Sequence, residues 1–301
     1  MLDIALLGCG GMMPLPNRFL TSMFLRLNGR FLLLDCGEGT QVSLKMLGWG
    51  FKNIDVILIT HFHADHVAGL PGLLLTITNS GRTEPLHMIG PKGLEIVVKC
   101  LLVIAPELPF EIIFHEMEDA TNIKIRDFHI SSLPVEHRMP CFAYSIDVKR
   151  RGKFNINKAK ALNLPRTYWS ILQKNEMVLY EGKEYLPEMV MGDERKGLKV
   201  SYCTDSRPVA ALPDFIKDSD LFICEGIYGE DEKLNKAMEY KHMLFSEAAT
   251  LAKKGNVSEL WLTHYSPSLT APEEFLSVAK DIFENTHLGF DRKTAALLFS
   301  E

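Results

Sequence analysis

The chain has 301 residues, of which 47% are hydrophobic and 24% are charged, and its formal net charge is −5. This composition is typical of a globular protein with one large or two small domains, and no low-complexity stretch interrupts it. The net charge gives no sign of nucleic-acid binding, although such binding depends on where the basic residues cluster. No apolar run reaches the roughly 20 residues of a membrane-spanning helix.

The cysteines and the first residues of the chain indicate the cellular compartment of the protein. The six cysteines lie far apart and form no Cys-x-x-Cys pair, so reduced, mostly buried thiols are expected rather than a disulfide framework. The segment Met1–Ile4 lacks a basic region followed by a long apolar core, so no signal peptide is expected. We therefore predict a cytoplasmic protein.

Strand and helix patterns alternate along the first 105 residues. Gly8-Cys9-Gly10-Gly11 follows a strand as a dinucleotide-binding turn would, but Pro14 and Pro16 exclude the helix that such a site needs. The alternation therefore predicts an α/β layered fold without a nucleotide fingerprint. The expected strands are Ile4–Leu7, Met23–Leu27, Phe31–Leu34, Val56–Ile59 and Leu86–Ile89, and the expected helices end at Leu47 or span Leu70–Thr78 and Gly93–Ala105.

The second half continues with short strands and two longer helices. Residues 110–148 alternate as short strands, and Leu198–Cys203, Leu221–Cys224 and Glu259–Leu262 are predicted as further strands. A helix is expected at Phe245–Lys254, closed by Gly255 and Asn256, and the last long helix is expected at Pro272–Phe283.

Residues 149–196 break this rhythm and are predicted to form an inserted basic arm within a single domain that spans 1–301. No acidic residue occurs between Asp147 and Glu176, and the stretch also contains Tyr168 and Trp169. Phosphates attract lysine and arginine, and bases stack on aromatic rings, so the arm predicts an RNA partner. The alternative is a solvated, lysine-rich linker. The cations are Lys149, Arg150, Arg151, Lys153, Lys158, Lys160, Arg166 and Lys174.

The densest chemical signal is His61-Phe62-His63-Ala64-Asp65-His66, which follows an apolar strand. Neutral imidazole and carboxylate oxygen are the ligands that Zn²⁺ prefers. Because side chains alternate in extended backbone, His61 and His63 can point to one side, while Asp65 and His66 can face a second metal. The alternative, a solvated loop that happens to be rich in histidine, explains this spacing poorly. A metal site is predicted here.

Three residues far from the cluster in the sequence also follow the end of a strand, as the cluster does. His137 follows Pro134-Val135-Glu136, and Asp205 and His264 each follow a predicted strand. A single histidine at such a place is usually a polar loop residue. Sites in sheet-based enzymes assemble at the carboxyl ends of strands, so the residues together predict one shared site.

The chain resembles a known family at these residues. His-x-His-x-Asp-His after an apolar strand is the signature of the metallo-β-lactamase superfamily, whose fold is an αββα sandwich. Further phrases resemble its ribonuclease Z branch over nearly the whole chain. They are Asp35-Cys36-Gly37-Glu38-Gly39-Thr40-Gln41, Gly69-Leu70-Pro71-Gly72-Leu73, Gly81-Arg82-Thr83-Glu84-Pro85-Leu86 and Gly90-Pro91.

The resemblance implies roles for individual residues. It implies that Asp65 also orients the attacking water and that His242 protonates or stabilises the leaving oxygen. His87, His115, His129 and His287 are expected to be structural or exposed. The implied ligands are His61, His63 and His137 for one zinc, Asp65, His66 and His264 for the other, and Asp205 between them.

The function implied by the resemblance is hydrolysis of a phosphodiester to remove the 3′ trailer of precursor tRNA. Two Zn²⁺ ions per chain are expected, with Mn²⁺ as a possible substitute. The arm is expected to grip the tRNA elbow, and a homodimer is expected. Two alternatives stay open: a related dimetal hydrolase of a small ester or cyclic phosphodiester, and a catalytically silent RNA-binding subunit. The complete ligand set speaks against the silent subunit.

Overall fold

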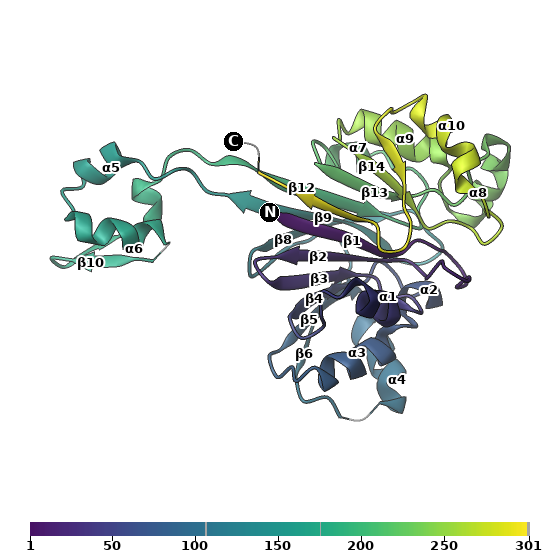
Figure 1. The fold of residues 1–301 in the computed structure, drawn as a ribbon, viewed down its shortest axis with the longest axis horizontal. Coiled ribbons are helices and arrows are strands. Elements are labelled where there is room, and N and C mark those ends of the chain that lie inside the picture. Colours follow the sequence, from purple (N-terminus) through teal and green to yellow (C-terminus); the bar gives the residue numbers. More distant parts are fainter. Residues whose placement is uncertain (106, 175, 300–301) are drawn as a thin grey trace. The chain divides into compact units, whose positions relative to one another are not determined.

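The computed structural model describes residues 1–105, 107–174 and 176–299 of the chain (Figure 1). These residues form two compact units. The main unit comprises Met1–Asp147 and Lys199–Leu298, and the small unit comprises Val148–Leu198 with Phe299. No helix in the described ranges has the length and apolar character needed to cross a membrane.

Two seven-stranded sheets form the centre of the main unit. Strands β3 to β6 of the first sheet run parallel, as do β12 to β15 of the second. The first sheet has the order β16 (Thr294–Leu297), β1 (Leu2–Gly8), β2 (Ser22–Leu27), β3 (Arg30–Leu34), β4 (Ile54–Leu58), β5 (Leu86–Pro91) and β6 (Ile112–Met117). The second has the order β15 (Thr286–Leu288), β14 (Leu260–Thr263), β13 (Leu221–Glu225), β12 (Arg195–Cys203), β9 (Cys141–Arg150), β8 (Phe128–Val135) and β7 (Asn122–Ile125).

Helices cover the outer face of each sheet. In Figure 1, α1, α3 and α4 lie along the first sheet, and α7, α9 and α10 lie along the second. The first group comprises α1 (Thr40–Leu47), α2 (Ala64–Val67), α3 (Leu70–Asn79), α4 (Leu94–Leu101) and the 3₁₀ turn Leu102–Ile104. The second comprises α7 (Leu212–Phe215), the 3₁₀ turn Asp231–Lys233, α8 (Leu234–Tyr240), α9 (Phe245–Lys254), the 3₁₀ turn Pro272–Phe275 and α10 (Leu276–Lys280).

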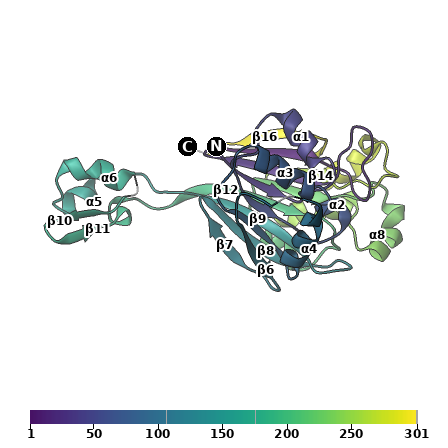
Figure 2. The same cartoon turned by 90° about the horizontal axis from the view of Figure 1, so that it is seen from below.

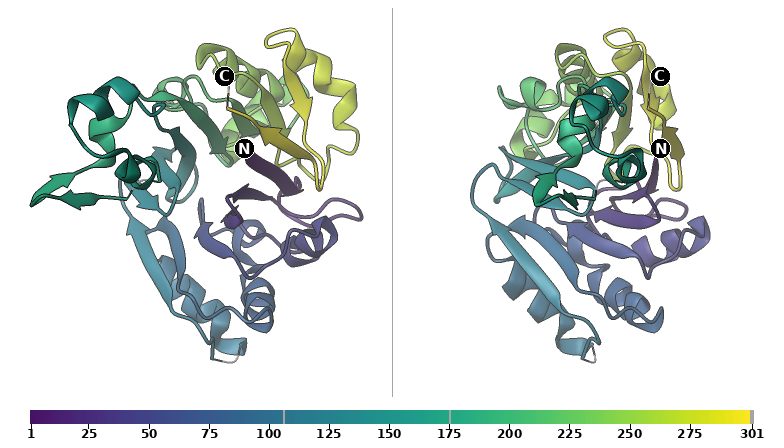
Figure 3. Two further views of the ribbon diagram at one scale, coloured as in Figure 1. Left: turned by 60° about the vertical axis from the view of Figure 1, so that its left-hand side comes forward. Right: turned by 90° about the vertical axis from the view of Figure 1, so that its left-hand side faces the viewer.

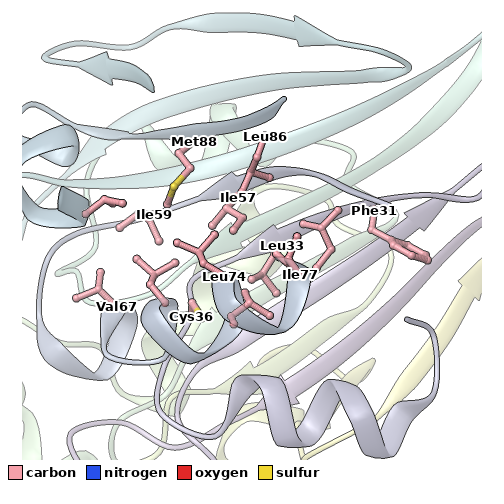
Figure 4. Packing of buried hydrophobic residues seen from close by; sticks show 14 of the residues in the cluster. Phe31, Leu33, Cys36, Ile57, Ile59, Val67, Leu74, Ile77, Leu86 and Met88 are labelled. Atoms are coloured by element: carbon pink, nitrogen blue, oxygen red, sulfur yellow. The ribbon is translucent and has the colours of Figure 1, made fainter. Parts of the chain in front are cut away.

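Apolar packing holds α3 onto the first sheet. Figure 4 shows Leu74 and Ile77 of α3 packed with Leu33 and Ile57 of the sheet, and all four are fully buried. Each such side chain contributes about 1.5–3 kcal/mol through burial. Pro71 lies in the first turn of the helix, where its missing N–H costs nothing. This packing fixes the end of β4, from which the chemical cluster extends.

The two sheets face each other, as the superfamily resemblance predicts. The hydroxyl of Tyr144 on β9 donates to the carbonyl of Ile59 (2.8 Å), and that of Tyr202 on β12 donates to Asp35 (3.3 Å). Figure 2 shows β7, β8 and β9 side by side in the second sheet. The architecture is therefore the αββα sandwich of the metallo-β-lactamase fold.

The C-terminal end departs from the prediction. The expected continuous helix Pro272–Phe283 is wrong, because the chain winds as a 3₁₀ turn to Phe275 and its α-helical part stops at Lys280. The tighter turn brings Phe275 so close to Gly229 that a β-carbon added at Gly229 would lie 2.3 Å from that of Phe275. The short strands β15 and β16 were not predicted. Figure 3 shows the yellow C-terminal strand β16 beside the purple strand β1.

The small unit has its own apolar core. Trp169 donates from its indole nitrogen to the carbonyl of Leu164 (3.0 Å), and its ring lies 5.6 Å from that of Phe154. The aromatic pair expected to stack on bases is therefore partly committed to this core. The elements are α5 (Ile156–Ala161), the 3₁₀ turn Arg166–Tyr168, α6 (Trp169–Gln173), the hairpin β10 (Val178–Tyr180) with β11 (Lys183–Tyr185), and the 3₁₀ turn Pro187–Val190.

Candidate metal centre

The histidine cluster begins where β4 ends. All five residues of β4 are buried, and the N–H of Ile59 donates to the carbonyl of Ile89 (2.8 Å), so the strand delivers the next residues at the edge of the sheet. His63 has extended backbone (φ −65°, ψ 151°) and precedes the first turn of α2. As expected from the alternation, His61 and His63 face each other, with 2.9 Å between Nε2 and Nδ1.

The distant residues reach the same place from the other sheet. His137 follows β8, Asp205 follows β12 and His264 follows β14. Nε2 of His137 lies 3.2 Å from Nδ1 of His63, and Nε2 of His264 lies 3.2 Å from Nε2 of His66. The fold therefore brings together all seven residues expected to bind metal.

Asp205 lies between the two groups of histidines. Its Oδ1 lies 3.8 Å from Nε2 of His61 and 3.9 Å from Nε2 of His137. Its Oδ2 lies 3.1 Å from Nε2 of His66 and 3.2 Å from Nε2 of His264. One carboxylate thus contacts both groups, the arrangement that a bridging ligand requires.

Asp65 borders the second group. Its Oδ2 lies 3.4 Å from Nε2 of His264 and 3.7 Å from Nε2 of His66. The same oxygen accepts a hydrogen bond from the N–H of Met12 (2.6 Å). The carboxylate is therefore held by the loop that follows β1, at the border between the buried histidines and solvent.

The donor set fits divalent metal. Ligand atoms of His61, His63, His137 and Asp205 lie within 4.8 Å of one another, and those of Asp65, His66 and His264 do so as well. Among the described residues, Nδ1 of His264 is buried without a hydrogen-bond partner, and Oδ2 of Asp205 faces the Nε2 atoms of two histidines at 3.1–3.2 Å, an arrangement that a bound cation would compensate. The chain therefore holds a site for divalent metal.

Electrostatics support the same conclusion. Burial lowers the pKa of His61, His63 and His137, so these imidazoles are neutral at pH 7 and offer their lone pairs. Burial alone would lower the pKa of His66 too, but Asp205 and Asp35 hold it well above its usual value. One side of the site thus supplies neutral ligands and the other favours positive charge.

Three residues of the site have backbone in the left-handed region that side chains other than glycine rarely adopt. The φ angles are 54° at Asp35, 53° at Asp205 and 57° at His264. Such conformations cost of order 1–3 kcal/mol each and persist where the surrounding structure enforces them. Here each one turns the chain sharply after a strand and directs a side chain towards the centre.

His242 lies next to the metal-binding residues, in the loop between α8 and α9. Its Nδ1 lies 2.9 Å from Oε2 of the fully buried Glu225 and 3.7 Å from Oδ1 of Asp205. Burial would lower the pKa of His242, but Glu225 raises it to about 9. Glu225 was not predicted as a site residue, although it ends strand β13 and so carries the same signal as Asp205.

Five of the seven residues, together with His242, line one cleft of about 640 Å³ in the main unit, and His61 and His66 are fully buried behind them. Its lining also includes Met12, Arg138, Lys236 and Tyr240. The remaining histidines lie elsewhere: His87 and His115 contact each other (3.0 Å), His129 is on β8 and His287 is on β15. The cleft therefore combines the cationic side chains of Arg138 and Lys236 with the histidine–aspartate cluster.

The sandwich fold and its histidine–aspartate cluster define a metal-dependent hydrolase of the metallo-β-lactamase superfamily. The chain is 58% identical to ribonuclease Z of Clostridium kluyveri, over 100% of both chains. It is 55% identical to that of Clostridium acetobutylicum, over 99% of both. The chain therefore belongs to the ribonuclease Z family.

Structural comparison and a family model add to this picture. The human tRNase Z, short form, superposes with a TM-score of 0.72 at 24% identity, covering 99% of this chain and 100% of that one. The metallo-β-lactamase fold protein YhfI of Bacillus subtilis gives 0.71 at 18% identity, over 98% and 100%. A family model described as "Anti-Pycsar protein Apyc1" matches residues 2–151. The structural likenesses support the fold.

Proposed function

We propose that this protein is a dizinc endoribonuclease that hydrolyses a phosphodiester to remove the 3′ trailer of precursor tRNA. The observation that carries the proposal is the full-length identity of 58% to a ribonuclease Z, combined with a complete set of metal-binding side chains. A single domain spanning 1–301, with an inserted arm at 149–196, belongs to the proposal. So does a cytoplasmic homodimer.

The metal-binding roles follow the two groups of side chains. His61, His63 and His137 would hold one ion, and Asp65, His66 and His264 the other, with Asp205 between them. When bound, such ions lower the pKa of water and neutralise charge on the phosphate oxygens. Imidazole and carboxylate donors suit zinc, and manganese would accept them as well.

In this proposal, Asp65 orients the attacking water. Its Oδ2 lies at the edge of the cleft, where the N–H of Met12 fixes it. Burial alone would raise the pKa of Asp65, but His264 and His66 hold it below its usual value, so the group is an ionised hydrogen-bond acceptor. An ionised carboxylate at this point can accept a proton of the water and direct its lone pair at phosphorus.

His242 supplies the proton for the leaving oxygen. A pKa of about 9 makes the imidazolium the main form at neutral pH, because Glu225 stabilises its charge. The side chain of His242 is 15% exposed and lines the cleft, and its Nδ1 contacts Oε2 of Glu225. General acid catalysis of this kind typically contributes 10²–10⁴-fold.

The small unit is proposed as the arm that binds the body of the tRNA. Lys149, Arg151, Lys153 and Arg166 are exposed, and Arg150 is half-buried against Phe299, 5.0 Å from its ring centroid. Cations in this density would neutralise several phosphates at once. Because Trp169 packs against Phe154, the main contribution of the arm is charge rather than base stacking.

One observation favours a second candidate, a dimetal hydrolase of a small ester or cyclic phosphodiester. A family model whose description is not ribonuclease Z, "Anti-Pycsar protein Apyc1", matches residues 2–151, so the histidine cluster and His137 also fit a second family of the same fold type. The two candidates differ in the substrate and share the hydrolytic centre. Full-length relatives at 48–58% identity favour the RNA substrate.

A substrate panel separates the two candidates. The zinc-loaded protein would be incubated with a 3′-extended precursor tRNA, a cyclic nucleotide and a nitrophenyl phosphodiester, and kcat/KM measured for each. We expect the precursor to have the highest kcat/KM, with cleavage at the junction of the trailer. A higher value for a cyclic nucleotide, with the precursor left intact, would establish the second candidate instead.

A further inference from the structure

Arg207 lies two residues after Asp205, and the reaction described above gives it no role. Its side chain is 13% exposed, and both terminal nitrogens are occupied. Nη1 donates to Oε2 of Glu247 (2.9 Å) and to the backbone carbonyl of His242. Nη2 donates to Oε1 of Glu247. A planar guanidinium is the group that can make this bidentate contact and a third bond together.

The backbone around Arg207 joins two further segments of the site. The N–H of Arg207 donates to the carbonyl of Glu136 (3.0 Å), next to His137. The N–H of Ser206 donates to Oε1 of Glu225 (2.6 Å), whose Oε2 contacts His242. The segment from Asp205 to Arg207 therefore contacts His242 in two ways: through Glu225, which binds its imidazole, and through its backbone carbonyl.

Arg207 adds a side-chain restraint to the loop that carries His242, beside the backbone bonds and the Lys241–Glu136 pair that already hold it. Lys241, immediately before it, has a φ of 62°, and the N–H of His242 donates to the carbonyl of Ala237 (2.8 Å) within α8. On the far side, Glu247 accepts from the N–H of Leu244 (3.0 Å) and so caps α9. Arg207 is the side chain that joins this cap to the carbonyl of His242.

We propose that Arg207 is a positioning residue that holds the imidazole of His242 against Glu225 and towards the leaving oxygen. This inference rests on the proposed function, because it assigns the proton donor to His242. Without the guanidinium, Glu247 and the carbonyl of His242 lose a shared donor, and the loop rotates away from Glu225. Metal binding by Asp205 does not use the guanidinium and persists.

A comparison of leaving groups tests this role. An alkoxide leaving group, as in RNA, needs a proton in the transition state, whereas a nitrophenolate leaves without one. Arg207→Met should lower kcat for a dinucleoside monophosphate and for precursor tRNA by about 10–100-fold, with KM within about twofold. Turnover of bis(p-nitrophenyl) phosphate and zinc content should stay within about twofold of the unmodified protein. Arg207→Lys should recover little, because an ammonium cannot bind Glu247 in bidentate fashion.

Two controls distinguish positioning from general damage. Arg30 pairs with the buried Asp55 on the first sheet, away from the site, so Arg30→Met should leave the turnover of both substrates unaffected. Combined with His242→Ala, the Arg207 substitution should add no further loss, because both act on one step. Equal losses on both substrates, loss of zinc, or losses that multiply in the double variant would overturn the proposal. Failure of the unmodified protein on tRNA would refute the proposed substrate, while the dinucleoside comparison would still decide the role of Arg207.

Discussion

Oδ2 of Asp35 lies 2.8 Å from Nδ1 of His66, and both side chains are fully buried. Oδ1 of the same carboxylate accepts from the N–H of Thr60 (2.8 Å), so its position is fixed by the chain just before the histidine cluster. A carboxylate that accepts the Nδ1 proton leaves Nε2 of His66 free to bind metal. In the proposed ligand set, Asp35 would thus favour the tautomer of His66 whose Nε2 can bind metal.

Replacing Asp35 with Asn should weaken metal binding, because an amide of the same shape has no charge to orient and polarise His66. The expected loss of affinity is about 10–100-fold, measured by competition with a chelator of known strength. Asp3→Asn, which removes a carboxylate paired with Arg26 on β1, should leave the affinity unchanged. Equal affinity in the Asp35 variant would show that the contact is structural.

Asp205→Ala should abolish binding at both metal positions, because its two oxygens face different histidine groups. The unmodified protein should contain two equivalents of zinc by elemental analysis, and the variant close to none. His137→Ala, which removes a ligand from one group alone, should retain about one equivalent. Retention of one full equivalent by the Asp205 variant would contradict a bridging carboxylate.

His242→Ala should retain metal and lose RNA cleavage by about two to four orders of magnitude, the scale of a general acid. The substitution spares the seven proposed metal-binding side chains, so elemental analysis serves as the internal control. Single-turnover rates on precursor tRNA give the chemical step directly. An unchanged rate would reduce His242 to a surface residue.

Deleting residues 152–194 should impair tRNA binding while leaving the chemistry intact. Nε of Arg195 donates to the carbonyl of Arg151 (2.8 Å), so the ends of the deletion lie together and a short Gly/Ser turn can join them. Turnover of a chromogenic phosphodiester should survive, and KM for precursor tRNA should rise steeply. The slope of log affinity against log salt should become shallower by a little under one unit for each phosphate that the protein no longer neutralises.

A milder variant keeps the small unit folded. Lys153, Lys160 and Arg166 are exposed, so replacing them with Gln removes charge without disturbing the core of the unit. In this variant, the slope of log affinity against log salt should also become shallower, by less than in the deletion. An unaltered KM for precursor tRNA in both variants would make the segment a linker.

The sequence was sufficient to predict the site wherever residues follow strong strand patterns. β4 and β14 are short, mostly apolar and fully buried, so His61 and His264 were recognisable as residues at strand ends. The αββα fold and ribonuclease Z membership were predicted from local phrases and are confirmed by the structure and the relatives. The roles of individual ligands stay predictions.

Long-range pairings could not be predicted from sequence patterns. The pairing of Arg207 with Glu247 joins residues 40 positions apart and leaves no periodic signal. Strand β16 depends on its antiparallel pairing with β1 at the other end of the chain, because the four residues Thr294–Leu297 carry little strand pattern of their own. The continuous helix predicted at Pro272–Phe283 is wrong, since the chain changes from a 3₁₀ turn to an α-helix after Phe275, the residue that packs closely on Gly229 from a distant segment. Such features arise from tertiary packing.

The most direct test of the account is the cleavage of a 3′-extended precursor tRNA, labelled at its 5′ end, by the zinc-loaded protein. We predict one cut at the junction of the trailer, loss of cleavage after chelation, recovery on adding zinc or manganese, and no cleavage by the Asp205→Ala variant. An intact precursor in the presence of metal, while a small phosphodiester is turned over, would contradict the assignment of tRNA as substrate.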